Sequence, residues 1–77
     1  MAHKLTEADE SNLANWFTHH PPTNDQKADY VSIRDAAKAY AKVIMECTPS
    51  CADQTAALRK LRESVMIANS AIACNGK

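Results

Sequence analysis

Residues 23–47, TNDQKADYVSIRDAAKAYAKVIMEC, decide the fold of this chain. Thr23 and Gln26 have the spacing of a capping box, in which backbone donors at a helix start are satisfied by two side chains. Apolar residues then recur at intervals of three and four, as they do on one face of a helix. Pro49 ends the pattern, because proline lacks a backbone donor and its ring clashes with the preceding turn. We therefore predict one long helix that begins near residue 23.

A second helical stretch follows after a short connection. Ser50, with Asp53 three residues later, is the expected cap, and Asn75 with Gly76 is a typical helix stop. The apolar stripe of this stretch consists of Ala57, Leu58, Leu61, Val65, Ala68 and Ile72. Two long helices joined by about three residues pack as antiparallel neighbours. The sequence thus predicts a helical hairpin over about residues 23–74.

The N-terminal segment predicts a short helix over about residues 6–18. Thr6 is the expected cap, and negative charge follows in the first turn, where the helix dipole favours it. The acidic residues are Glu7, Asp9 and Glu10, and the apolar ones are Leu13, Trp16 and Phe17. Pro21 and Pro22 then form a stiff elbow. We expect this helix to fold across the hairpin, because a helix so short is not stable alone in water.

The composition favours one all-α domain over residues 1–77. Glycine occurs once while alanine is abundant, which disfavours the tight turns of a sheet and favours closely packed helices. A chain of this size buries only about 60% of its unfolded surface, and its apolar stripes are broader than one partner helix covers. We therefore expect the hairpin to need a second contact, either with the N-terminal segment or with another subunit in a homo-oligomer.

The charge balance bounds the partners. Nine basic and nine acidic residues give a formal net charge of zero, whereas affinity for DNA or RNA scales with the number of phosphates neutralised. We therefore expect no nucleic-acid polymer as a partner. No apolar run reaches the roughly 20 residues that span a bilayer, so no membrane partner is expected. The N-terminus lacks the apolar core of a signal peptide and the three cysteines are an odd number, which favours a reduced cytosolic protein.

Four residues of the long helix, spaced four apart, lie along one face: Gln26, Tyr30, Arg34 and Lys38. We interpret this row as part of a binding surface for a small anion; a solvated helix face with one half-buried tyrosine is the alternative. Arg34 has apolar neighbours, and its guanidinium can hold phosphate oxygens in a fork of hydrogen bonds. Its alternative role is that of a surface arginine paired with Glu46 or a neighbour of Asp35.

Asn69 and the aromatic residues have two interpretations each. Asn69 interrupts the apolar run VMIANSAIA, and a buried amide must be hydrogen-bonded. It therefore either fixes the pairing of the helices or contacts a ligand. The rings of Trp16, Phe17 and Tyr30 belong either to the core or to a platform on which a nucleobase stacks.

The sequence gives little support for catalysis or metal binding. His19 and His20 are adjacent, point in different directions and lack a Cys/His cluster with zinc spacing, so we expect them to cap or stack. Cys47 and Cys51 are expected to act as small apolar filler, with a disulfide as the alternative. No nucleophile has an obvious paired base, and no glycine-rich phosphate loop is present. We therefore expect neither an enzyme nor a cofactor.

Most of the chain, about residues 16–75, resembles a known family. The two runs that carry the resemblance are WFTHHPPTNDQKADYVSIRDAAKAYAKVIMECTPS and ALRKLRESVMIANSAIACN. The matching residues are Phe17, His20, Pro22, Gln26, Tyr30, Ile33, Arg34, Ala37, Cys47, Pro49, Leu61, Val65, Met66, Ala68, Asn69, Ala71, Ile72 and Ala73. The pattern is similar to the helical-hairpin domain of phage-encoded cyclic-nucleotide sponges, the small anti-CBASS and anti-Thoeris proteins.

This resemblance implies a homo-oligomer, a hexamer, in the host cytoplasm. It implies binding of cyclic dinucleotides such as cGAMP, or of cyclic trinucleotides, without cleavage, so that CBASS-type effectors are not activated. By position Arg34 would hold phosphate, and the ring of one of three residues, Phe17, His19 or His20, would stack on a base. The chain departs from the family pattern at Ile67, where an aromatic residue is common, and at Cys74, where a basic residue is common.

A function of another class is the alternative. The hairpin would then be an interaction protein that binds a host protein through its broad apolar face. Mixing the protein with cyclic nucleotides separates the two hypotheses, because a specific ligand at a hundredfold its dissociation constant adds about 2.7 kcal/mol of stability. No melting shift with any of them favours the interaction protein.

Overall fold

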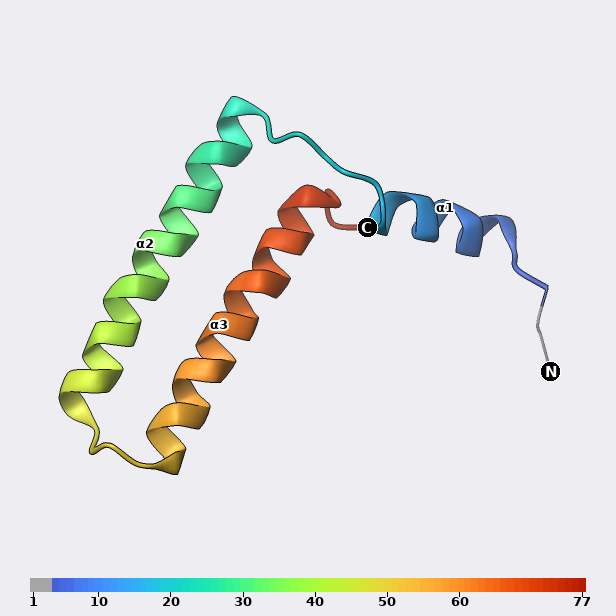
Figure 1. Ribbon diagram of the computed structural model, residues 1–77. Helices are drawn as coiled ribbons and strands as arrows, with labels where there is room; N and C mark the ends of the chain where they lie inside the picture. Colours follow the sequence, from blue (N-terminus) through green and yellow to red (C-terminus); the bar gives the residue numbers. More distant parts are fainter. Residues whose placement is uncertain (1–3) are drawn as a thin grey trace.

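The computed structural model describes residues 4–77, which form three helices (Figure 1). These are α1, Glu7–Trp16; α2, Asn24–Cys47; and α3, Ala52–Ala73. No strand occurs in this part of the chain, so the all-α prediction is confirmed. Each helix lies within two residues of the bounds that the sequence predicts.

Capping boxes begin the first two helices. In α2 the backbone N–H of Gln26 donates to Thr23 Oγ1 over 3.1 Å, and the backbone N–H of Thr23 donates to Gln26 Oε1 over 3.0 Å. Thr6 and Asp9 make the same reciprocal pair at the start of α1. Each box satisfies two of the donors that a helix start leaves unpaired, which confirms the predicted starts of both helices.

The cap of α3 differs from the prediction. Cys51, and not Ser50, is the N-cap residue, and its side chain makes no capping hydrogen bond. The C-terminal end is the predicted one: Asn75 and Gly76 both have positive φ, at 54° and 75°. The N–H of Gly76 donates to Ala71 O over 2.9 Å, the long-range bond of a Schellman motif.

The second and third helices form an antiparallel hairpin, lying side by side in Figure 1. Two hydrogen bonds link them near the open end: Gln26 Nε2 donates to Ile72 O over 3.3 Å, and Tyr30 OH donates to Asn69 O over 3.5 Å. The rest of the seam is apolar and only half-buried. Among the described residues, only Ile44 and Cys74 are buried hydrophobic residues, and each is still 8% exposed, so the hairpin alone has almost no core.

The first helix does not fold across the hairpin, and that prediction is wrong. In Figure 1, α1 extends away from the end of α3, and among the described helices only α2 and α3 contact each other. Side-chain bonds to the C-terminal turn hold α1 in place: Asn15 Nδ2 donates to Cys74 O over 3.3 Å and Trp16 Nε1 to Lys77 O over 3.1 Å. The segment with Pro21 and Pro22 therefore connects the end of α1 to the start of α2 without folding α1 back onto the hairpin (Figure 1).

The resulting molecule is flat and extended. Its dimensions are 50 × 40 × 15 Å and its radius of gyration is 17.1 Å, whereas a compact chain of this length has a radius of about 11.5 Å. The smallest dimension is close to the thickness of a single layer of helices. Every helix of such a layer has both faces open to solvent.

Candidate functional site

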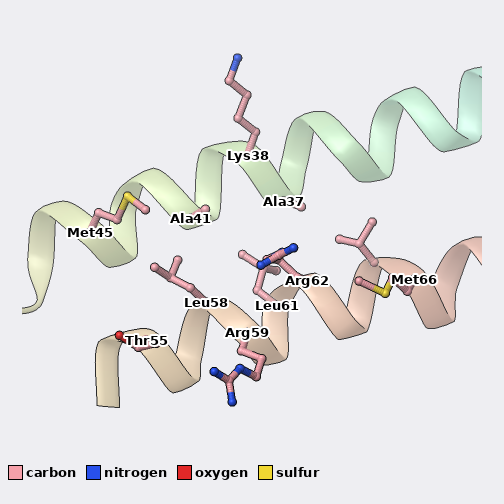
Figure 2. A pocket seen from close by; sticks show the side chains of 11 residues that line it. Ala37, Lys38, Ala41, Met45, Thr55, Leu58, Arg59, Leu61, Arg62 and Met66 are labelled. Carbon is pink, nitrogen blue, oxygen red and sulfur yellow. The ribbon is translucent and has the colours of Figure 1, made fainter. Parts of the chain in front are cut away.

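A groove between α2 and α3 runs along one face of the hairpin. It has two adjoining hollows, which share Val65. The open-end hollow, of about 390 Å³, is lined by Lys27, Tyr30, Val31, Arg34, Val65 and Asn69. The turn-end hollow, of about 650 Å³, is lined by Ala37, Lys38, Ala41, Met45, Thr55, Leu58, Arg59, Leu61, Arg62, Val65 and Met66 (Figure 2).

The helical repeat explains why these residues share a face. On α2 the lining residues recur as single residues or adjacent pairs, one per helical turn, from Lys27 to Met45, which keeps them on one side of the helix. On α3 the same pattern runs from Thr55 to Asn69. In Figure 2 the side chains of Leu58 and Leu61 point from α3 toward α2, and with Met45 on α2 they give the turn-end hollow an apolar floor.

The groove is basic although the chain is neutral. Five of the nine basic residues line the two hollows, and none of the acidic residues that the structure describes does so. The five are Lys27, Arg34, Lys38, Arg59 and Arg62. A cleft that carries one sign of charge between apolar walls attracts ions of the opposite sign. The groove is therefore suited to a small anionic ligand.

Arg34 is available to a ligand. The ion pairs between described residues are Lys42 with Glu46, at 3.9 Å, and Lys60 with Glu63, at 3.4 Å. Glu46 thus pairs with Lys42 and not with Arg34, so the alternative in which Arg34 pairs with Glu46 does not describe this fold. A guanidinium without a carboxylate partner keeps all five of its N–H donors for other acceptors.

Asn69 faces the same hollow with an unsatisfied acceptor. Its Oδ1 is buried and accepts no hydrogen bond from the residues described. Leaving a buried acceptor unpaired costs about 1–3 kcal/mol, so such a group in a hollow is suited to a ligand donor. The amide does not fix the pairing of the helices: it is the backbone carbonyl of Asn69 that accepts from Tyr30 OH, at the long limit of 3.5 Å.

The four residues of the predicted row lie in three different places: the open-end hollow, the turn-end hollow and the contact between α2 and α3. Tyr30 and Arg34 both line the open-end hollow, and Lys38 lines the turn-end hollow one helical turn further on. Gln26 is engaged within the protomer: its Nε2 donates to Ile72 O and its Oε1 accepts from the backbone of Thr23. Its amide holds α2 against α3 and lines neither hollow.

The three candidate stacking residues do not lie in either hollow. Phe17 is 82% exposed at the end of α1, and His19 is exposed in the elbow. The ring of His20 is half-buried, with Nε2 2.6 Å from Asn15 O. One protomer therefore does not bring these side chains to Arg34.

Sequence reasoning missed three cations of the groove: Lys27, Arg59 and Arg62. Lys27 precedes Arg34 by seven residues, and two helical turns return a residue to the same face, so the signal was present. Arg59 and Arg62 lie next to Leu58 and Leu61 of the apolar stripe. Their place in the groove follows from the alignment of α3 on α2, which no local pattern contains.

The remaining candidates lie outside the groove. Cys47 and Cys51 are free and exposed, so the filler interpretation is wrong for both. Ile67 is 70% exposed and Cys74 is buried against the end of α1; neither residue that departs from the family pattern lines a hollow. Within residues 4–77 no group of three or more His, Cys, Asp or Glu side chains is placed to hold a metal ion.

The helices of the described region also contain no segment long and apolar enough to cross a membrane. Comparison with known proteins agrees with the helical-hairpin fold. Residues 9–73 match the model of the family described as Acb2/Tad1, hairpin domain. No curated protein and no solved structure gives a significant match. Because the family match spans α2, α3 and most of α1, the chain belongs to the Acb2/Tad1 hairpin-domain family, the phage anti-CBASS and anti-Thoeris cyclic-nucleotide sponges.

Proposed function

We propose that this protein binds cyclic di- or trinucleotides in the open-end hollow and withholds them from CBASS-type effectors in the host cytoplasm. The observation that carries the proposal is the acid-free basic groove in which Arg34 has no carboxylate partner and shares the open-end hollow with Asn69, whose Oδ1 is unsatisfied. A phosphodiester and a nucleobase edge are the groups that this pair complements.

Each residue of the hollow has a distinct part in this binding. Arg34 holds phosphate oxygens with paired N–H donors, and Lys27 adds a second positive charge. Asn69 Oδ1 accepts from an amino or ring N–H group on a base edge, as asparagine does when it recognises adenine. The ring of Tyr30 offers an apolar surface on which a base or ribose rests.

Sequestration differs from catalysis in what the hollow must supply. Binding alone requires complementary charge and hydrogen-bond partners, whereas cleavage of a phosphodiester requires an activated nucleophile and an acid or a metal ion. The family consists of ligand-sequestering sponges and not enzymes. We therefore propose stoichiometric capture, in which the cyclic nucleotide leaves the protein chemically unchanged.

The site is completed by other copies of the chain in a hexamer. Ligand sites usually have volumes of about 300–1,000 Å³, and the open-end hollow of about 390 Å³ is near the lower bound. The chain exposes 6462 Å², roughly 1,850 Å² more than the approximately 4,600 Å² of a compact protein of its mass. An excess of this size supports extensive burial between protomers.

Calorimetric titration of the Arg34→Ala variant tests the proposal. With cGAMP and with a cyclic trinucleotide as probes, we expect the affinity for at least one of them to fall at least tenfold, because the phosphate loses its bidentate partner. The oligomeric mass should not change. Lys60→Ala is the matched control, since Lys60 is also a basic residue of a hairpin helix but lines neither hollow.

Three results would overturn the proposal or a part of it. Unchanged affinity in Arg34→Ala would remove this arginine from the site, and absence of binding of either probe to the unmodified protein would remove the function. Recovery of linear or hydrolysed nucleotide after denaturing the complex would instead make the protein an enzyme.

A further inference from the structure

The α1 helix carries an apolar and acidic face that no part of its own chain covers. Glu10, Leu13 and Phe17 recur at spacings of three and four and so lie on one side of the helix. All three are exposed, and α1 makes no helix-to-helix contact within the described chain. Its ten residues include three acidic and no basic side chains. Such a helix is not stable alone in water, so a covering surface is required.

The turn-end hollow is complementary to this face in chemistry. Its floor is aliphatic, and its charged residues are Lys38, Arg59 and Arg62, without an acidic one. Figure 2 shows Lys38 projecting from the α2 side and Arg59 from the opposite, α3 side, so cations flank the apolar floor. A helix with leucine and phenylalanine toward the floor would place its carboxylates next to these cations.

The two surfaces also match in length. At 1.5 Å per residue, the ten residues of α1 extend about 15 Å, and the α3 side of the hollow, residues 55–66, extends about 16 Å. The hollow has a volume of about 650 Å³. One face of a short helix therefore covers it from end to end.

The helix does not reach the hollow of its own chain. Asn15 and Trp16 hold the end of α1 at Cys74 and Lys77, whereas the middle of the hollow, at Leu61, lies about 20 Å away along α3. From this anchor α1 extends in the direction away from the hairpin (Figure 1). The occupant must therefore come from another molecule. A second copy of the chain is suited to this, because each copy has one α1 helix and one turn-end hollow.

We propose that α1 of one protomer lies in the turn-end hollow of a second protomer, and that the exchange is reciprocal. This contact specifies one interface of the proposed oligomer and leaves the open-end hollow, with Arg34, to the nucleotide. A reciprocal exchange forms a closed, twofold-symmetric pair in which each contact occurs twice. It would bury part of the excess surface of the extended monomer.

Photo-crosslinking tests the contact in the full-length protein. A Leu13→p-benzoylphenylalanine variant is mixed with a heavy-isotope-labelled unmodified copy, and the two are unfolded and refolded together. We expect ultraviolet light to join position 13 to labelled peptides from residues 55–66. Ala8→p-benzoylphenylalanine, on the opposite side of α1, is the control and should yield few such products. Crosslinks to the same chain, to other surfaces or to none would overturn the proposal.

Charge exchange tests it independently, with sedimentation velocity as the readout. Glu7→Lys with Glu10→Lys makes the helix basic, and Arg59→Glu with Arg62→Glu makes the hollow acidic; Asp9 is spared because it caps α1. Each double variant alone should lose the wild-type mass, and an equimolar mixture should regain it, because each helix then meets a hollow of opposite charge. Lys60→Glu is the control that should keep the mass.

The outcomes separate this contact from the nucleotide site. Retention of the wild-type mass by both double variants, or failure of the mixture to reassociate, contradicts the exchange. If the Arg59→Glu and Arg62→Glu variant keeps its mass but no longer binds cGAMP or a cyclic trinucleotide, the turn-end hollow is a ligand site and the exchange is wrong. Loss of cGAMP and trinucleotide binding in Arg34→Ala alone concerns only the open-end hollow. The contact between α1 and the turn-end hollow is then tested by the mass of the equimolar mixture of the two double variants.

Discussion

Arg34 and Asn69 show how the helical register determines which polar groups are available to a ligand. Glu46, the carboxylate considered as a partner for Arg34, pairs instead with Lys42, which lies one turn before it on the same helix. Arg34 instead turns toward the hollow that Asn69 lines on the facing helix. The packing of α2 on α3 thus places Arg34 and Asn69 in the lining of one hollow.

An Asn69→Leu substitution separates a binding role from a structural one. Leucine has a similar volume and removes the buried acceptor, whose unpaired state costs about 1–3 kcal/mol. We expect the melting temperature of the unliganded protein to stay the same or rise, and the affinity for the preferred cyclic nucleotide to fall about tenfold. Thermal denaturation and calorimetry measure the two effects.

A large drop in melting temperature would show that the amide of Asn69 stabilises the hairpin, which contradicts its assignment to the ligand. Val31→Ala is a suitable comparison, because Val31 lines the same hollow but has no polar atom in its side chain. Its effect on affinity should be small.

At the scale of the elements, local signals predict the helices well and their packing poorly. Capping at Thr6 and Thr23, and the stop at Asn75 and Gly76, depend on residues a few positions apart, so the sequence contains them. The position of α1 depends instead on bonds to the backbone of the C-terminal turn, more than 50 residues away in sequence. A carbonyl group is present at every position, so no residue pattern marks this contact.

The start of α3 allows a gain in stability. Cys51 has the extended backbone of an N-cap residue but no capping bond, and Gln54 stands at the third helical position. A Cys51→Ser variant would supply the missing side-chain acceptor at the helix start, which is worth about 1 kcal/mol. We expect a rise of about 4 °C in melting temperature. Cys47→Ser, at the end of α2, is the control and should give no rise; an equal rise in both would indicate an effect of thiol removal.

At the scale of the whole molecule, the three-dimensional shape shows how little core the chain has and where its charges gather, which the composition alone does not contain. Chain length and broad apolar stripes predicted a marginally stable monomer. The extended layer of helices, with only two buried hydrophobic residues among those described, agrees with a monomer that has little core to stabilise it. Neutral net charge was the ground for expecting no polyanion as a partner, but it concealed the basic groove, because acidic residues lie elsewhere on the surface. Charge totals contain no information on which residues share a face.

The same shape makes binding and assembly interdependent. A hollow open to solvent on one side holds a charged ligand weakly, because water screens its cations. Covering the groove with a second protomer lowers the local dielectric constant and strengthens each contact with phosphate. Affinity for a cyclic nucleotide should therefore belong to the oligomer and not to the separate chain.

Native mass spectrometry in the presence of excess cGAMP and a cyclic trinucleotide tests this account most directly, because one spectrum reports both assembly and bound mass. We predict a multimer of the chain, a hexamer, that carries intact cyclic nucleotide, and an Arg34→Ala multimer of the same size without it. A monomer that carries neither nucleotide would contradict the account.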